Sequence, residues 1–269
     1  MSTPAQVWQY RTLVGNLALR ELRSRYKKSV VGWGWSLINP AVSLGIYTLV
    51  FGYFLKGTAP LAGNGRTSSF ALWLFAALVV WNAFAGGINV SIQSFLGSGG
   101  LLTRTYFPPE CPVVAGSTTV AIQTGLETAI LLGFMTAIGN VGWTFLLMAP
   151  ILVLVTALAL GLGMIVSLLN VRYRDVNYLV GIGLQIMFYG TPIVYRLDLI
   201  PETIGPFDTS QVLGLNPMTH FVDGMRKVTY LQEVPTLGNW AGMLVPALLA
   251  LTVGWTFFGA KAPQYIEEL

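Results

Sequence analysis

Few residues of this chain have the types and spacing that catalysis or metal binding requires. The sequence contains one histidine, His220, which lies beside Thr219 and near Asp223, and one cysteine, Cys111. A metal site needs several such ligands and a disulfide needs a second cysteine, so neither is expected within the chain. The G-x-x-x-x-G-K-[ST] pattern of a nucleotide-phosphate loop is also absent. The sequence therefore predicts no catalytic residue, no metal site and no cofactor on this chain.

A single acidic residue, Glu127, lies in the otherwise uncharged run from Cys111 to Val171, and Gln123 precedes it by one helical turn. An ionisable group inside an apolar helix is costly and usually marks a functional site or a buried polar partner. Gln123 can share a hydrogen bond or a proton with Glu127 on the same helix face. A proton relay needs a chain of such groups, which the other apolar runs lack. We interpret the pair as a helix-packing contact or a contact with transported material, with proton coupling as the alternative.

The composition places these residues in a membrane protein. Of 269 residues, 54% are hydrophobic and 10% are charged, against about 25% charged in a typical soluble domain. The sequence therefore predicts an all-α integral membrane protein with several spans. The net charge of +4 is interpreted as a topology signal, and no nucleic-acid partner is expected. No cleavable signal peptide is expected either.

Charge-free runs divide a transmembrane domain, residues 32–263, into six expected spans. Pro40 is expected to kink the first span, and residues 97–100 to form a polar exit from the second. Gly139-Asn140 is expected to form the turn between the third and the fourth. The six spans are 32–55, 68–93, 112–138, 143–170, 176–195 and 236–260.

The distribution of basic residues predicts that both termini lie in the cytoplasm. With the N-terminus inside, the inner segments contain ten basic residues and the outer segments five. The inner residues are Arg11, Arg20, Arg23, Arg25, Lys27, Lys28, Arg104, Arg172, Arg174 and Lys261. The outer residues are Lys56, Arg66, Arg196, Arg226 and Lys227.

Residues 5–28, within a cytoplasmic segment 1–31, have the pattern of an amphipathic helix. Apolar residues recur at three- and four-residue spacing, at Val7, Tyr10, Val14 and Leu17. Basic residues form a stripe on the other side, at Arg20, Arg23 and Lys27. Such a helix is expected to lie in the headgroup layer of an anionic membrane. The alternative is a solvated run of charge.

Residues 198–235 do not fit a simple bundle, because this segment is long, acidic and still contains apolar turns. Asn216-Pro217 has the pattern of a helix start, with Asn as the cap and Pro in the first position. We expect one or two short re-entrant helices at the outer surface, covered by protein or water.

Aromatic residues recur along three of the expected spans. They are Trp33, Tyr47, Phe51 and Phe54 on the first, Phe70, Trp73, Trp81 and Phe84 on the second, and Phe188, Tyr189 and Tyr195 on the fifth. Interfacial belts and core packing explain most such residues. The alternative is that some rings line a wide pathway in which sugars stack on them.

Two polar connections, 101–112 and 170–175, form a cytoplasmic face suited to docking a soluble partner.

Five motifs together resemble a known family. They are RELRSRYKKSVVGWGWSLINP (20–40), YFPPECPV (106–113), NVRYRDV (170–176), TPIVY (191–195) and NPMTHFVDGMR (216–226). In this order they resemble ABC-2 type permeases that export cell-surface polysaccharides such as O-antigen, capsule, teichoic acid and galactan. The chain departs from the family pattern at Pro109, where many members have a basic residue.

The resemblance implies a homodimer of six-span subunits in the bacterial inner membrane, each docked to a nucleotide-binding subunit that holds ATP and Mg. The implied contacts with that ATPase are Arg20, Arg23, Tyr26, Lys27, Arg104, Tyr106, Phe107, Glu110, Arg172, Arg174 and Asp175. The first and fifth spans would line the pathway, with Trp33, Tyr47, Phe51, Phe54, Tyr189 and Tyr195. Asn216, Pro217 and Arg226 would lie around the outer exit. The cargo would be a glycan on a polyprenyl lipid.

Three other interpretations stay open. A drug or lipid exporter of the same fold would share these motifs. A membrane-embedded transferase acting on lipid-linked sugars would need a polar catalytic cluster, and the acidic residues of 198–223 form no known motif. An ion-coupled transporter would need inverted repeats and further intramembrane charges, neither of which is evident.

Overall fold

The computed structural model describes residues 3–25, 31, 34–54, 57, 59–102, 104–196, 203–204 and 207–266. These residues are mainly helical, as the composition predicts. One small departure from the all-helical expectation is a two-stranded antiparallel ladder, β1 (Thr203–Ile204) with β2 (Phe207–Asp208).

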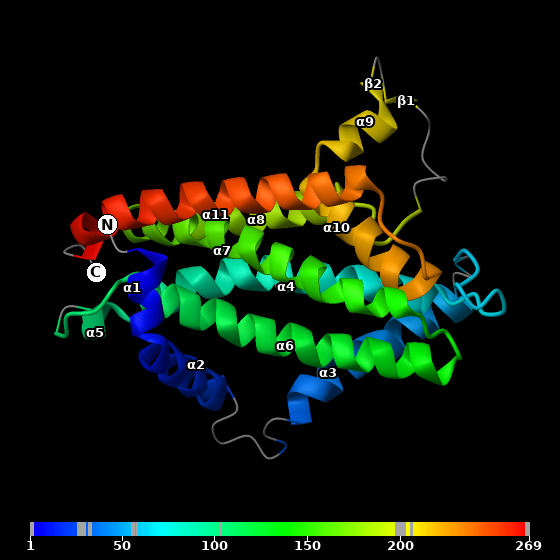
Figure 1. The fold of residues 1–269 in the computed structure, drawn as a ribbon, viewed down its shortest axis with the longest axis horizontal. Helices are drawn as coiled ribbons and strands as arrows, with labels where there is room; N and C mark the ends of the chain where they lie inside the picture. The colour runs from blue at the N-terminus through cyan, green and yellow to red at the C-terminus, as the bar shows by residue number, and fades with distance from the viewer. Residues whose placement is uncertain are drawn as a thin grey trace.

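Four long helices form the body of the molecule: α4 (Phe70–Leu96), α6 (Glu110–Ala137), α7 (Met148–Arg172) and α11 (Leu237–Ile266). Within the described residues, these are the helices long and apolar enough to cross a membrane, α7 together with the preceding η3. Helix α4 is at the centre, with most of its residues buried, and packs against α6 and α7. Helix α11 lies along α7, and all four run lengthwise in Figure 1.

Two shorter apolar helices lie where the first and fifth spans are expected. Helix α3 (Trp35–Tyr47) contains Pro40 and continues into the π-helix η2 (Thr48–Phe54). Helix α8 (Val176–Tyr189) is shorter than the expected span 176–195, because its cap at Gly190 is followed by a turn containing Pro192. Both short helices leave many apolar side chains exposed. The count of six spans stays a prediction.

The N-terminal segment forms two helices instead of one. Helix α1 (Pro4–Gln9) begins with a capping box between Thr3 and Gln6, and α2 (Arg11–Arg25) follows a break at Tyr10. The apolar face packs on protein: Val7, Val14 and Leu17 are buried with Phe107, Cys111 and Ala115. The ends of other helices therefore cover this apolar face, and the position of the segment in the headgroup layer stays a prediction. The chain termini, α1 and the short α5 (Gly99–Leu102) lie together at one end of the body, the terminal end (Figure 1).

The opposite end, the turn end, contains the link between α6 and α7. Gly139 adopts φ +70°, which favours glycine, and Asn140 follows it, so the predicted hairpin turn is confirmed. The 3-10 helix η3 (Trp143–Leu147) leads into α7. After α9 (Thr209–Gly214), α10 (Pro217–Arg226) begins as predicted, since the Asn216 side chain accepts from the Met218 amide and Pro217 occupies the first turn. The π-helix η5 (Lys227–Leu231) continues α10, whereas α9, β1 and β2 project from the body (Figure 1).

Candidate functional site

A polar cavity of about 190 Å³ lies between α3, α4 and α6. Its polar lining residues are Asn39, Ser43, Tyr47, Asn82, Gln123 and Glu127. The three residues from α3 are spaced four apart, and the two from α6 are also four apart, so each set lies on one helix face. The expectation that Gln123 and Glu127 share a face is confirmed by this common cavity.

Glu127 is the carboxylate of this cavity and is 6% exposed. The Asn82 side-chain amide on α4 donates to its Oε2 at 3.1 Å. Sequence reasoning missed Asn82, although an amide inside the long apolar run of α4 is a signal of the same kind as Glu127. It also missed Asn39 and Ser43, whose four-residue spacing with Tyr47 could have been noticed.

A second, mainly apolar cavity of about 380 Å³ lies between α3, α4 and the end of α8. Tyr47 and Leu78 line both cavities, so the two adjoin. Phe188 and Tyr189 line the second cavity with their ring centroids 5.4 Å apart, and Phe188 also contacts Trp81 edge to face at 5.3 Å. Two of the residues expected on the pathway, Tyr47 and Tyr189, are thus brought together in space.

The other aromatic candidates are placed differently. Phe54 is 66% exposed at the end of η2, and the Tyr195 hydroxyl donates to the Tyr189 carbonyl at 2.9 Å. Phe51 belongs to η2 but its side chain falls outside the described part, as does the whole of Trp33. The aromatic residues of α4 are buried among their neighbours. For Phe70, Trp73, Trp81 and Phe84, this burial supports the packing interpretation.

Helix α10 holds the turn that follows α8 from both of its ends. At the start, the Asn216 amide donates to the Gly190 carbonyl at 3.2 Å and to Thr191 Oγ1 at 2.8 Å. At the end, Arg226 donates through Nη1 to the Pro192 carbonyl and through Nη2 to the Ile193 carbonyl, each at 2.6 Å. Two of the predicted exit residues therefore fix the end of α8, while Pro217 starts the helix that carries them.

The Arg226 side chain is buried, with 5% exposed. Its Nε donates to the Trp73 carbonyl at 3.2 Å, and the guanidinium lies 3.2 Å from the centre of the Trp73 ring. A planar guanidinium can satisfy several carbonyls and stack on an aromatic face at once, which a lysine cannot do. Arg226 thereby joins α10, α4 and the α8 turn.

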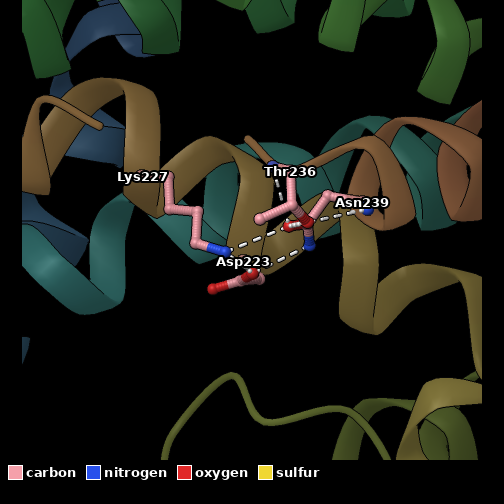
Figure 2. Close-up of polar contacts among 4 residues, drawn as sticks. All are labelled: Asp223, Lys227, Thr236 and Asn239. Atoms are coloured by element: carbon pink, nitrogen blue, oxygen red, sulfur yellow. Dashed lines mark hydrogen bonds and ion pairs between the residues drawn. The ribbon is translucent and has the colours of Figure 1, made fainter. Parts of the chain in front are cut away.

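A polar cluster connects α10 and η5 with the start of α11 (Figure 2). The Lys227 ammonium lies 2.8 Å from Asp223 Oδ2, and the Asn239 amide donates to the same oxygen at 2.8 Å. The side-chain oxygen Oδ1 of Asn239 accepts from Lys227 at 3.0 Å and from the Thr236 hydroxyl at 2.7 Å. Each of these side chains has a partner within the cluster, so the cluster has a structural role in holding these helices together.

The one histidine is also engaged structurally. His220 Nε2 lies 2.9 Å from the Gly214 carbonyl, and its ring packs against α11 at Gly242, where an added Cβ would overlap it. Asp223 bonds to Lys227 and Asn239 instead of His220. Across the described residues, no group of three or more His, Cys, Asp or Glu side chains could hold a metal ion.

Two side chains, Asn140 and Tyr230, connect the loops at the turn end by hydrogen bonds. The Asn140 amide donates to the Tyr230 carbonyl at 3.0 Å, and its oxygen accepts from the Asn64 backbone at 3.0 Å. The Tyr230 hydroxyl donates to the Pro60 carbonyl at 3.0 Å and accepts from the Ser69 amide at 2.8 Å. Burial raises the pKa of the Tyr230 hydroxyl, which further favours its protonated, hydrogen-bond-donating form. Sequence reasoning identified Asn140 only as a turn residue and missed Tyr230.

The terminal end presents exposed charges from three segments. Arg20 and Arg23 are exposed on α2, and Arg104 is exposed in the loop before α6. The end of α7 and the link to α8 expose three more charged residues, Arg172, Arg174 and Asp175. Glu21 accepts from the Ser94 hydroxyl at 3.1 Å, which attaches α2 to α4. Two further predicted contact residues, Tyr26 and Lys27, lie outside the described residues.

Three residues in the loop before α6 and at the start of that helix are predicted to contact the ATPase, and one of them is exposed while two are buried. Tyr106 is 97% exposed, whereas Phe107 is 7% exposed and Glu110 is fully buried. Phe107 packs beneath α1 and α2. Burial therefore removes Phe107 and Glu110 from direct reach of a docked protein, and leaves them able to support the loop that carries Tyr106.

Known proteins resemble the chain along its whole length. The profile of a family described as "ABC-2 type transporter" matches residues 12–230. The chain is 24% identical over 265 residues to the O-antigen export system permease protein RfbA of Myxococcus xanthus, covering 98% of each protein. It is 26% identical over 254 residues to an RfbA protein of Klebsiella pneumoniae, covering 93% of this chain and 92% of the relative. It is 23% identical over 259 residues to the polysialic acid transport protein KpsM of Escherichia coli, covering 93% and 94%.

Proposed function

The chain belongs to the ABC-2 type transporter family, and from that premise we propose that it is the transmembrane subunit of an ATP-driven exporter of a cell-surface polysaccharide. The observation that carries the proposal is the full-length similarity to an O-antigen export permease, at 98% of both proteins. The chain itself acts as a transport subunit, and ATP with Mg binds a separate subunit.

The proposed arrangement is a six-span subunit in a bacterial inner membrane with both termini in the cytoplasm. The excess of basic residues in the sequence segments expected inside, ten against five, supports this orientation. Helices α3 and α8 would be the first and fifth spans, and α10 a re-entrant helix at the outer surface. The carbonyl-binding Arg226 supports such a position, because backbone at membrane depth needs internal partners.

The proposed docking site for the ATPase consists of the exposed charged residues of the terminal end together with Tyr106. These residues come from three separate segments, α2, the loop before α6 and the α7–α8 link. A rigid partner that touched all three could tilt them together and so shift the pathway between two states. Phe107 and Glu110, which are buried beneath this surface, would transmit the movement of the loop to α6.

The proposed pathway wall is formed by α3 and α8 at the interface with a second copy of the chain. Both helices expose apolar side chains, among them Ile46 at 54% and Ile186 at 68%. Tyr47 and Tyr189 flank one cavity, and aromatic faces of this kind can stack on sugars while hydroxyl groups meet water. The proposed cargo is a glycan attached to a polyprenyl lipid.

Two experiments test this function. Removing residues 1–28 should abolish co-purification with the proposed ATPase subunit, and undiminished co-purification would contradict the docking site. Replacing Tyr47 and Tyr189 with Ala should reduce the glycan at the cell surface while ATPase binding persists. Unchanged export by that double variant would assign the rings to packing, and export of drugs or free lipids without glycan would refute the proposed cargo.

A further inference from the structure

The polar cavity between α3, α4 and α6 contains more hydrogen-bonding groups than one helix contact needs. The Asn82–Glu127 bond already joins α4 to α6. Asn39 and Ser43 from α3, and Gln123 from α6, line the same open volume. Polar groups between helices of a membrane protein are stabilised by polar partners, so a cavity with six polar lining residues, Tyr47 among them, favours a polar occupant.

The mixture of groups is suited to a ligand that both donates and accepts hydrogen bonds. The side-chain amides supply donors and acceptors, while a carboxylate accepts. A cation would need acceptor oxygens and balancing charge, yet Glu127 is the one carboxylate lining the cavity. A proton route would need a series of titratable groups, and beside Glu127 the lining offers Tyr47 alone. Sugar hydroxyls match amides and a carboxylate.

The dimensions and walls agree with that chemistry. A volume of about 190 Å³ corresponds to roughly six water molecules at about 30 Å³ each, which is the scale of a single sugar ring. Phe75 and Leu78 form apolar walls against which the C–H face of a ring can lie. The cavity also adjoins the aromatic cavity through Tyr47 and Leu78, so a glycan in one can place a unit in the other.

We infer that Asn82, Gln123 and Glu127, with Asn39 and Ser43 of α3, form a subsite that binds the hydroxyl groups of one sugar unit of the transported glycan. This inference rests on the proposed function and adds to it the residues that recognise the cargo. Because α3 supplies part of the lining and the body supplies the rest, an occupied subsite holds α3 against α4 and α6.

The test measures saccharide binding directly. The probe is the oligosaccharide released from the surface glycan of the source strain and labelled with tritium, and the chain is held in lipid nanodiscs. Glu127→Gln should weaken binding about tenfold, and Gln123→Ala and Ser43→Ala should each weaken it about fivefold, as expected for lost charged and neutral hydrogen bonds. Ser43→Ala and Gln123→Ala leave the Asn82–Glu127 bond in place, so they test the subsite even if Glu127→Gln misfolds.

Thr124→Val is the matched control, because Thr124 is buried on the same helix and is not among the lining residues of this cavity. It should bind the probe like the wild type. Wild-type binding by the Gln123, Ser43 and Glu127 variants would overturn the inference while leaving the exporter function intact. A sodium or pH dependence of export that Glu127→Gln removes without changing saccharide binding would identify an ion site instead. Failure of the wild-type chain to export glycan would refute the proposed function itself.

Discussion

Helices α11 and α8 both contact α7, but they do so in different ways. Helix α11 approaches α7 backbone to backbone: a Cβ added at Gly161 would overlap the Ala250 backbone, and one at Gly254 would overlap the Gly161 carbonyl. Helix α8 has no buried residue, and the space around Gly181 is open. Lipid tails are as apolar as the side chains, so close fit between backbones distinguishes a fixed helix pair from a loosely held one.

The contrast distinguishes the tightly packed body from the proposed pathway wall of α3 and α8, whose apolar side chains are exposed in a single chain. The long helices are matched in shape, whereas α8 is fastened at its end by Asn216 and Arg226 of α10. In the proposed exporter, the loosely packed helices are those that meet the second subunit and the cargo. Motion of α8 would therefore be centred on its α10 attachment.

The largest expected effect comes from removing that attachment. Arg226→Met leaves the buried carbonyls of Pro192 and Ile193 without these donors, so we expect a loss of about 3 kcal/mol in the free energy of unfolding. Arg226→Lys should be intermediate, because lysine keeps the charge but not the planar fork. Thermal unfolding in detergent measures both. A Met variant that melts like the wild type would show that α8 is held elsewhere.

The contrast between α11 and α8 is tested by the same substitution in each region. Gly161→Ala forces α7 and α11 apart and should destabilise the protein by about 2 kcal/mol, the typical cost of overpacking. Gly181→Ala in α8 meets nothing within 4 Å and should be neutral or stabilising by up to about 1 kcal/mol. Equal melting temperatures for the two variants would remove the distinction between body and wall.

The smallest expected effect concerns the cluster of Figure 2. The side chains of Lys227 and Asp223 are 20% and 36% exposed, so water weakens their attraction. Asp223→Asn should therefore lower stability by less than about 1 kcal/mol, in contrast to the buried Arg226 three residues away. Melting curves at low and high salt provide the measurement. A loss as large as that of Arg226→Met would mean that this partly exposed cluster contributes as much to stability as the buried contacts of Arg226.

Local sequence pattern was sufficient for the long helices and for several of their ends. The turn at Gly139-Asn140 and the start of α10 at Asn216-Pro217 follow from short-range chemistry, a positive φ and a side-chain cap. The predicted single N-terminal helix was wrong, because the break at Tyr10 and the protein-covered apolar face depend on what packs against them. Helix α8 is shorter than the predicted fifth span, since an apolar run does not show where a turn ends the helix.

Hydropathy, charge and local spacing are properties of neighbouring residues, so they were sufficient to predict a membrane-embedded helical protein, its family motifs and an unusual carboxylate at Glu127. The tertiary structure shows which side chains share a space. It paired Glu127 with Asn82 on another helix, brought Tyr47 beside Tyr189, and buried Phe107 and Glu110 while exposing Tyr106. Contacts between residues far apart in the chain depend on how whole helices fit together, and that fit is not encoded in any short stretch of sequence.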